Sequence, residues 1–324
     1  MTRTPILTIL ITTYNRSVAL EVLLSQLSSY QEKGLVFNVL VSDDCSTDNS
    51  EEVCKKWSNI LQGFSYLKTK QNLGMDNNFR TVYENFHTEY CWLPGDTRHI
   101  SFDGLKNVID ILSTSNYDAL ILRCREEMPK ERIEYSDINT LMNQQGWHIT
   151  NNASCVIPKR FITPLLYHRY WGTTVLHMGI FVENLCMMEN FKVLYMGDVY
   201  ITELDIPGFF KGGWTNHPFL NFGKLWYEFV MSLPNQIDVD IKHKVLQDHN
   251  KFTQIFSVSD IHRKILTYRE TYIKSYRENR HYMPYVVTTP LWIYDLLICA
   301  IPLSVYDAVF AIYKALFKRE NKKP

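Results

Sequence analysis

What the 324-residue chain lacks excludes several classes of protein. Its seven cysteines include no C-x-x-C pair, which argues against a disulfide framework and a structural zinc site and suits a reducing cytosol. The 34 basic and 34 acidic residues leave no net charge, so nucleic acid is not an expected partner. The sequence shows no internal repeat, and its 46% of hydrophobic residues exclude global disorder.

Long uncharged apolar runs are also missing. The apolar stretch Pro290–Leu316 is interrupted by Asp295, Pro302 and Asp307, and none of its uncharged parts reaches the ~18 residues that span a bilayer. The N-terminal run Ile6–Ile11 is short and is not followed by a small-residue cleavage site. We therefore expect a buried strand there and not a signal peptide.

Glycine is absent from the loop where two classes of nucleotide-binding enzyme place it. No G-x-G-x-x-G follows the first apolar run, which disfavours a Rossmann dehydrogenase. A nucleotidyltransferase would carry a glycine-rich, basic phosphate loop at this place, and Thr13–Ser17 contains no glycine.

Strand-like and helix-like segments alternate from the N-terminus to residue 122. The predicted strands are Ile6–Thr13, Val36–Val41, Phe64–Lys68, Tyr90–Leu93 and Ala119–Leu122. Between them we expect helices over residues 18–30, from a capping box at Asp48, over Asn77–Phe86, and from a cap at Asp103 to Leu112. This alternation predicts βαβ units and a mostly parallel sheet flanked by helices.

The second half of the chain is patterned differently. Residues Met128–Gly223 are less regular and predict loops of the kind that carry specificity. Helices are expected from about Asp238 to His281, and Arg263–His281 combines basic residues with tyrosines at four-residue spacing. That helix either extends a membrane-binding surface or presents a solvated face.

Polar side chains follow each of the first four predicted strands. They occupy Thr12–Arg16, Ser42–Asp48, Gln71–Asn78 and Gly95–His99. Ligands of parallel α/β sheets bind beyond the carboxyl ends of the strands. A nucleotide needs an aromatic face, acceptors for its base and ribose, and positive charge for its phosphates, and these loops supply them in that order. Asp43 and Asp48 are expected to be turn and cap residues rather than ligands.

This series of loops resembles the GT-A glycosyltransferases of family 2. The matching motifs are T-x-Y-N-R from Thr12, V-x-D-D-x-S-x-D from Val41, N-x-G-x-x-x-N from Asn72, and the loop after Leu93. The resemblance covers Pro5–Leu112 well and extends more loosely to about Asn221. It is strongest toward the bacterial branch that builds O-antigen and capsular repeat units, which includes abequosyltransferase-like enzymes.

The resemblance implies a Rossmann-like GT-A fold and an inverting sugar transfer from a nucleotide-diphosphate sugar. Thr12, Tyr14 and Asp44 are implied to hold the base and ribose. The further donor-binding positions are Arg16, Asn72, Gly74 and Asn78.

The metal loop departs from the family pattern. Family members carry several carboxylates here, whereas this chain has Asp96, with Thr97 and Arg98 at the positions of the other acids. One interpretation is that Asp96 still holds Mg²⁺ or Mn²⁺, helped by Thr97 or His99. The other is that Arg98 itself supplies the positive charge for the departing diphosphate.

The general base also departs from the pattern. The family places an acid near the start of a helix after a glycine-containing loop, and in Trp171–Gly179 that position is taken by His177. An unperturbed imidazole pKa of ~6.5 suits a base at neutral pH. Glu183 and Asp205 are the alternative bases. The candidate aromatic platforms for the acceptor sugar are Trp147, Trp171 and Trp214, which equally suit core packing.

The resemblance implies a domain plan and partners. Residues 1–235 form the GT-A domain, with a nucleotide-sugar half at 1–112 and an acceptor half at 113–235, and residues 236–324 form a helical C-terminal extension. The apolar Pro290–Leu316 stretch and the basic residues around it suit peripheral binding to the inner face of the cytoplasmic membrane. The expected acceptor is an undecaprenyl-diphosphate-linked oligosaccharide; a helical hairpin on the catalytic domain and a homo-oligomer interface remain alternatives for the extension. A non-catalytic nucleotide- or sugar-binding scaffold with a degenerate metal loop is the alternative function.

Overall fold

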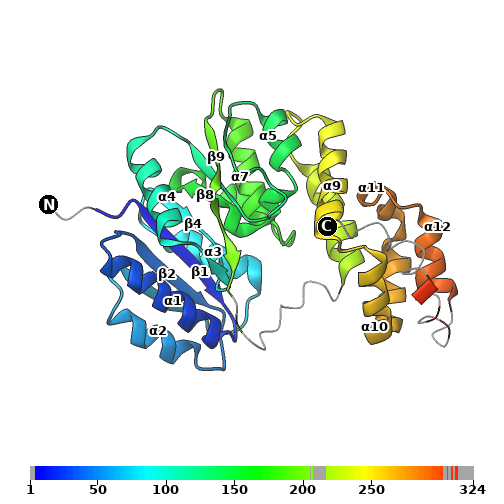
Figure 1. Cartoon of the computed structure of the whole chain (residues 1–324), viewed down its shortest axis with the longest axis horizontal. Helices are drawn as coiled ribbons and strands as arrows, with labels where there is room; N and C mark the ends of the chain where they lie inside the picture. The colour runs from blue at the N-terminus through cyan, green and yellow to red at the C-terminus, as the bar shows by residue number, and fades with distance from the viewer. Residues whose placement is uncertain are drawn as a thin grey trace, which may run out of the picture. The chain divides into compact units, whose positions relative to one another are not determined.

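The computed structural model of the chain describes residues 4–204, 206, 217–301, 305, 308, 311 and 312, with the backbone alone at 266–268. These residues fall into two compact units (Figure 1). The first holds the described residues up to 206 together with Leu233–Asp238. The second holds residues 217–232 and the described residues from Val239 onward.

The first unit is built on an eight-stranded sheet with the order β3-β2-β1-β4-β8-β6-β9-β7. Its strands are β1 (Leu7–Thr13), β2 (Asn38–Asp43), β3 (Phe64–Lys68), β4 (Tyr90–Trp92), β6 (Ala119–Arg123), β7 (Arg132–Tyr135), β8 (Cys155–Pro158) and β9 (Val193–Tyr200). Strands β3, β2, β1 and β4 are mutually parallel, and β6 is parallel to β9. Strand β8 is antiparallel to β4 and β6, and β7 is antiparallel to β9. The predicted mostly parallel α/β sheet is confirmed.

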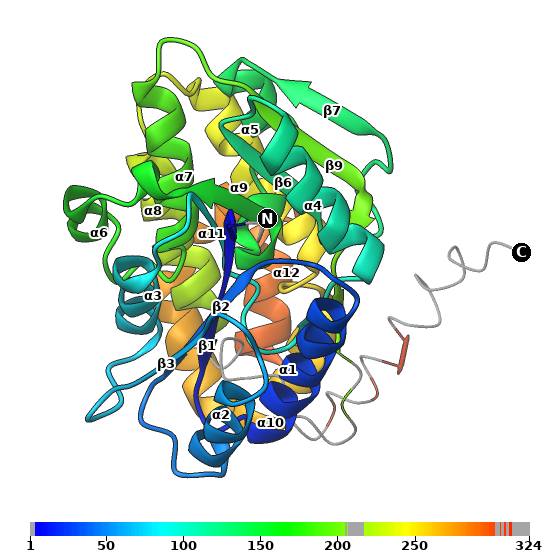
Figure 2. The ribbon, with the colours of Figure 1, turned by 90° about the vertical axis from the view of Figure 1, so that its left-hand side faces the viewer.

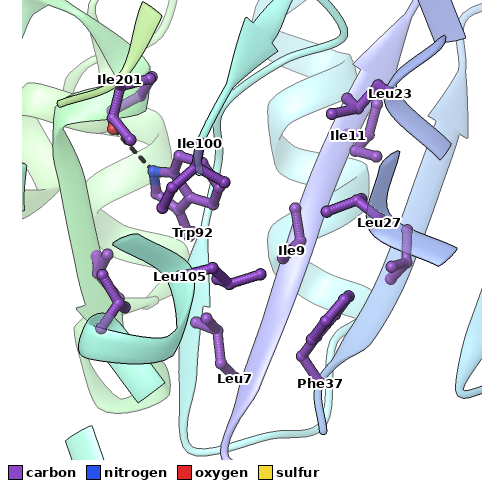
Figure 3. Close-up of a cluster of buried hydrophobic side chains, with 14 of the residues drawn as sticks. Leu7, Ile9, Ile11, Leu23, Leu27, Phe37, Trp92, Ile100, Leu105 and Ile201 are labelled. Carbon is purple, nitrogen blue, oxygen red and sulfur yellow. Dashed lines mark hydrogen bonds between the residues drawn. The ribbon is translucent and has the colours of Figure 1, made fainter. Parts of the chain in front are cut away.

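Helices cover both faces of β1, which explains why this strand is apolar along its length. The helices around it are α1 (Ser17–Glu32), α2 (Ser50–Ser58), α3 (Met75–Asn85) and α4 (Phe102–Thr114). Figure 2 shows α1 and α4 on one side of β1 and α3 on the other. Alternate residues of β1 pack with α1 and α4 in one buried cluster (Figure 3), whose labelled members include Leu7, Ile9, Ile11, Leu23, Leu27 and Leu105.

The middle of the chain is more regular than its sequence predicts. It contains β7, α5 (Ile138–Gln145), β8, α6 (Pro164–Arg169), α7 (Leu176–Met187) and β9. Strand β8 is only four residues long and buried throughout, and it lies between β4 and β6. Helix α7 is buried on nearly all sides, from Leu176 to Leu185, so its sequence shows no apolar stripe of helical period. The shortness of β8 and the all-round burial of α7 explain why the sequence pattern does not predict either element.

Two predicted helix starts need correction. Helix α4 is capped by Ser101, whose Oγ accepts a hydrogen bond from the Gly104 amide at 3.0 Å, while Asp103 lies in its first turn. Helix α2 has no side-chain cap at Asn49; instead Asp48 accepts hydrogen bonds from the amides of Ser50 and of Ser17, the first residue of α1. A carboxylate that follows β2 therefore fixes the start of two helices.

The second unit is helical, as expected. It contains a π-helix η5 (Phe219–Leu225), α8 (Trp226–Ser232), α9 (Val239–Thr253), α10 (Val258–Asn279), α11 (Met283–Val286), α12 (Leu291–Tyr294) and a π-helix η7 (Asp295–Ala300). Tyr272 and Tyr276 of α10 are buried against Phe219, so these tyrosines form core contacts rather than a solvated face. Within the described part of the chain, no helix is long and apolar enough to cross a membrane.

Candidate active site

Asp44 organises the loops that follow β2 and β3. Its Oδ1 accepts hydrogen bonds from the Leu73 amide at 2.8 Å and the Thr69 hydroxyl at 3.2 Å, and its Oδ2 accepts one from the Gly74 amide at 2.8 Å. Gly74 has φ +83°, a backbone conformation that side chains disfavour, and open space lies where a Cβ would be. Asp44 thus shapes this edge, and its Oδ2 retains capacity for a further donor.

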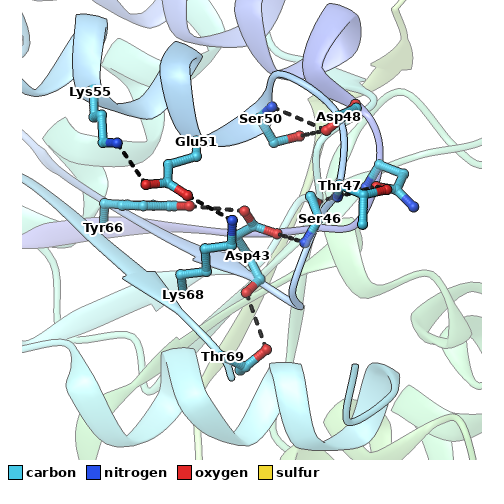
Figure 4. A network of polar contacts seen from close by, with 11 residues as sticks. Asp43, Ser46, Thr47, Asp48, Ser50, Glu51, Lys55, Tyr66, Lys68 and Thr69 are labelled. Carbon is cyan, nitrogen blue, oxygen red and sulfur yellow. Dashed lines mark hydrogen bonds and ion pairs between the residues drawn. The ribbon is translucent and has the colours of Figure 1, made fainter. Parts of the chain in front are cut away.

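The neighbouring acids hold the loop together (Figure 4). Asp43 is fully buried and accepts hydrogen bonds from the Ser46 amide and the Tyr66 hydroxyl, both at 2.8 Å. Burial, and then the hydrogen bond to Asp43, raise the pKa of Tyr66 above its ordinary value, so the phenol stays a donor. Asp43 and Asp48 therefore occupy turn and cap positions in the structure.

Asp96 lies buried at the end of the loop after β4. Its Oδ1 pairs with the Arg16 guanidinium at 2.9 Å, and its Oδ2 accepts a hydrogen bond from the Thr13 hydroxyl at 2.9 Å. Burial raises the pKa of this carboxyl, and the Arg16 cation and the Thr13 hydroxyl act in the opposite direction. The fold thus brings the predicted Arg16 and Asp96 together across 80 residues of sequence. Thr13, which the sequence analysis missed, completes the group.

The other predicted residues of this loop face different partners. Arg98 begins the short strand β5 (Arg98–His99), which pairs with β10 (Thr202–Glu203), and its guanidinium lies 3.2 Å from the Glu203 carboxylate. His99 Nδ1 is hydrogen-bonded to the Gln26 amide group. Thr97 accepts a hydrogen bond from the Leu204 amide through its carbonyl.

These contacts test whether the loop fits a divalent metal. Asp96 is the one carboxylate of residues 94–99, and both its oxygens already have partners, one of them a cation. In the described ranges, no three or more histidine, cysteine, aspartate or glutamate side chains gather into a metal site made by the protein alone. Mg²⁺ in nucleotide enzymes is held by one or two carboxylates together with substrate phosphates and water, and Asp96 can still supply one such carboxylate. In this arrangement Asp96 already pairs with Arg16, so a metal would have to share the carboxylate with that cation, and metal binding at Asp96 stays a prediction.

The remaining donor-site candidates lie around the carboxyl end of β1. Tyr14 is 44% exposed and has a ring face available, and Thr12 is half-buried on the strand face opposite Thr13. The Asn78 side chain is buried, donates to the Thr13 carbonyl at 3.4 Å, and has an Oδ1 without a partner among the described residues. Exposed Asn72 accepts a hydrogen bond from the Gly74 amide at 3.0 Å.

His177 lies in the first turn of α7, the position that the family resemblance assigns to the base. Its Nε2 is 3.0 Å from the Thr150 carbonyl, so Nε2 carries the proton and Nδ1 is the acceptor. Nδ1 is buried and contacts no donor in the described part of the structure. Burial lowers the pKa of His177 to about 4, so the ring is neutral at pH 7.

The alternative bases and the candidate aromatic platforms for the acceptor sugar either have other partners, are buried, or lie outside the described residues, except for Trp171. Glu183 is paired with Arg169 at 2.6 Å and with the Tyr170 hydroxyl. Trp147 is buried, as the core-packing interpretation requires, whereas Trp171 is 41% exposed. Asp205 and Trp214 lie outside the described residues.

The sequence analysis also missed Asp76. This residue of the first turn of α3 accepts a hydrogen bond from the Gly172 amide at 2.8 Å, so it contacts the loop that precedes α7. Its membership of the N-x-G-x-x-x-N segment was visible, but a contact 96 residues away leaves no local signal.

A mostly parallel sheet with helices on both faces and polar loops after β1, β2 and β4 is the architecture of the GT-A glycosyltransferases. The chain belongs to glycosyl transferase family 2, whose family model matches residues 8–181. The family assignment and the GT-A fold predicted from the sequence are thereby confirmed.

Individual relatives are more distant or match only in part. Abequosyltransferase RfbV of Salmonella typhimurium is 33% identical over 96 residues, which is 29% of this chain and 29% of that protein. Among solved structures, S. aureus TarS 1–349 in complex with UDP has a TM-score of 0.60 at 15% identity, covering 95% of this chain and 91% of TarS 1–349. The mannosyltransferase PcManGT from Pyrobaculum calidifontis, in complex with GDP-Man and Mn²⁺, has a TM-score of 0.52 at 14% identity over 98% of this chain and 89% of its own.

Proposed function

We propose that the chain transfers a sugar, with inversion at the anomeric carbon, from a nucleotide-diphosphate sugar to a hydroxyl of an undecaprenyl-diphosphate-linked oligosaccharide. The reaction belongs to O-antigen or capsular polysaccharide biosynthesis. The partial match to an abequosyltransferase supports this pathway, and family membership supports the chemistry.

One observation carries the proposal: Asp44, Arg16 and Asp96 project from separate loops at the carboxyl edge of β1, β2 and β4. The Asp44 carboxylate, fixed by the Leu73 and Gly74 amides, is the acceptor for the base edge or ribose, and Tyr14 is the stacking face. Thr12 and Asn72 line the same edge. In this proposal the nucleoside lies at Asp44 and Tyr14 and the diphosphate lies at Arg16.

Positive charge at the diphosphate comes from arginine in this proposal. Arg16 is held by Asp96, and its side chain is 31% exposed, so it can donate to a phosphate oxygen while it stays paired with Asp96. Arg98 lies in the same loop region, and among the described residues its ion-pair partner is exposed Glu203. Such a pair contributes about 0–1 kcal/mol, so a diphosphate can compete for Arg98. Both cations would stabilise the charge that develops on the leaving group.

His177 is the proposed base. The acceptor hydroxyl attacks the anomeric carbon, the bond from that carbon to the diphosphate oxygen breaks, and the nucleoside diphosphate leaves with the electron pair. The hydroxyl proton passes to Nδ1, the atom that the contact with Thr150 leaves as acceptor. The low pKa keeps Nδ1 unprotonated, and the hydroxyl becomes more acidic as its bond to carbon forms.

The lipid-linked acceptor makes membrane contact part of the proposal. Within the second unit, Trp292 is 64% exposed and Leu296 is 45% exposed on consecutive turns of α12 and η7. Exposed aromatic and aliphatic side chains at such positions suit the interfacial region of a bilayer. We place the acceptor half at residues 113–235 and the membrane-associating extension at 236–324, on the inner face of the cytoplasmic membrane. A homo-oligomer stays a prediction.

The experiment combines binding and turnover. Thermal shifts with UDP, GDP, CDP and dTDP, each with and without Mn²⁺, report the base preference and the metal requirement, because a ligand of the folded state raises its apparent stability. Transfer is then measured with the matching sugar nucleotides, and NMR of the product reports the anomeric configuration. Nucleotide binding without transfer or donor hydrolysis would favour the scaffold alternative, and full activity of both Asp44→Ala and Asp96→Ala would overturn the proposal.

A further inference from the structure

Asp76 joins two parts of the first unit that are remote in sequence. Its Oδ2 accepts a hydrogen bond from the Gly172 amide at 2.8 Å, and the nearby Thr174 amide also favours the charged form of this carboxylate. Burial raises the pKa of Asp76 above its ordinary value, and these amides oppose that shift. The Asp76 carboxylate thus binds the backbone of the loop before α7 at Gly172.

This loop has a backbone that needs external support. Gly172 has φ +77° and Thr174 has φ +66°, and the latter is unusual for a β-branched residue. Helix α7, which follows, has no side-chain cap at Val175. Because a carboxylate forms stronger hydrogen bonds to amides than a neutral group does, Asp76 is well suited to hold this conformation.

The same helix α3 contacts His177. Phe79, which lies one turn after Asp76 and on the same face of α3, has its ring centroid 6.0 Å from that of His177 in an edge-on arrangement. At the N-terminal end of α3, the amides of Leu73 and Gly74 are bound by Asp44. Residues 73–79 therefore contact the nucleoside carboxylate at one end and the proposed base at the other.

We infer that Asp76 is a positioning residue that fixes the 172–174 loop, and with it His177, relative to the donor subsite. This inference rests on the proposed function for the roles of Asp44 and His177. Asp76 itself makes no contact with substrate in this assignment. Its loss should disturb the transfer step more than donor binding.

The structural part can be tested without activity, by amide hydrogen exchange of the whole chain. Asp76→Ala should speed exchange of the Gly172 amide about tenfold or more, the expected result of losing a charged acceptor. Asp76→Asn, which keeps an acceptor oxygen, should restore most of the protection. Asp103→Ala is the matched control, since it removes an exposed acid from the first turn of α4. Unchanged exchange in Asp76→Ala would overturn the inference.

The kinetic part separates positioning from donor binding. Asp76→Ala should lower kcat for transfer about tenfold to a hundredfold while changing the donor KM less than about threefold, with rescue in Asp76→Asn. A raised donor KM with unchanged kcat would place Asp76 in the nucleotide site and overturn the inference. If the wild-type chain transferred no sugar, the proposed function would fail, and the exchange experiment would still decide whether Asp76 holds the loop. If Asp76→Ala failed to fold, Asp76→Asn and Asp76→Leu would be compared with wild type in both assays. Wild-type exchange and kcat in Asp76→Asn, together with faster exchange and lower kcat in Asp76→Leu, would support the inference. Wild-type values in both variants would overturn it.

Discussion

The carboxylates of the loop after β2, which we propose as the nucleoside edge, and the side chains at the start of α7 satisfy their buried oxygen and nitrogen atoms to different degrees. Both oxygens of Asp43 and both oxygens of Asp44 accept hydrogen bonds from the loops around them, although the nearby Asn78 keeps a buried Oδ1 without a donor among the described residues. At the start of α7, His177 Nδ1 and Asp76 Oδ1 are buried, and the described residues offer them no donor. A buried acceptor without a donor costs free energy and is uncommon in native proteins unless water or a ligand supplies the donor.

The difference indicates how the two regions take part in the reaction. If the donor binds at Asp44 as proposed, the hydrogen bonds of this carboxylate hold the edge in place before the donor arrives. The two buried atoms beside α7 that find no donor among the described residues are both acceptors, which complement a ligand rich in hydroxyl donors, as sugars are. The following predictions compare these two regions, beginning with the largest effect.

Asp44→Ala should have the largest effect, because it removes the acceptor for two loop amides together with the proposed nucleoside contact. We expect the nucleotide-induced thermal shift to vanish and transfer to fall about 100-fold or more. Differential scanning fluorimetry and a transfer assay measure the two effects. An intact thermal shift in Asp44→Ala would show that the preformed edge does not bind the nucleoside.

The Arg16–Asp96 pair tests which cation faces the diphosphate. Arg16→Met should lower kcat about 100-fold, the scale of losing one preorganised donor to a developing anion, and added Mn²⁺ should not restore it. In the wild type, EDTA should change the rate less than about twofold. Loss of activity with EDTA, recovered by Mn²⁺, would instead favour the interpretation in which Asp96 holds a metal.

The same contrast explains what the sequence could reveal. Strands β1, β2 and β4 were predictable because a parallel strand buried on both faces leaves a largely apolar run that ends in polar residues, and the edge strand β3 was predictable from its alternation. The loops after them, with Tyr14, Asp44 and Asp96, followed from the rule that ligands bind at carboxyl ends. The Arg16–Asp96 pair was missed as a pair because its members are 80 residues apart.

The region around α7 was harder to predict for a physical reason. Its position depends on β8 pairing with both β4 and β6 and on the contact of Asp76 with Gly172, none of which leaves a periodic signal. A four-residue buried strand and a helix buried all round lack the alternation and the stripe that reveal such elements. Long-range pairing, not local propensity, determines this half of the site.

The buried His177 should make stability depend on pH. Its folded-state pKa of about 4 lies below the ~6.5 of the unfolded chain, so the unfolded state binds more protons between these values. Stability is therefore full above pH 6.5 and falls as the pH decreases toward 4, by about 2 kcal/mol for this residue between pH 6.5 and 5. Urea unfolding at pH 7 and pH 5 should show a smaller loss for His177→Asn than for the wild type.

A second buried histidine, His148, does not affect this comparison. Burial lowers the pKa of His148 to about 3, which gives the same direction of pH dependence, but His148 is present in both proteins and cancels from the difference. Equal losses of stability in His177→Asn and wild type would show that the imidazole is not held neutral by burial.

The smallest predicted effect concerns Arg98, whose partner Glu203 is 45% exposed. If Arg98 assists the diphosphate, Arg98→Ala should lower kcat about tenfold, since Arg98 is held by an exposed carboxylate whereas Arg16 is fixed by the buried Asp96. Glu203→Gln is the matched variant: it removes the other half of the ion pair and should leave kcat unchanged or slightly raised, because Arg98 is then released toward the phosphate. Equal, small losses in both variants would assign the pair a structural role between β5 and β10, and Arg16 would then be the cation on which charge stabilisation at the diphosphate rests.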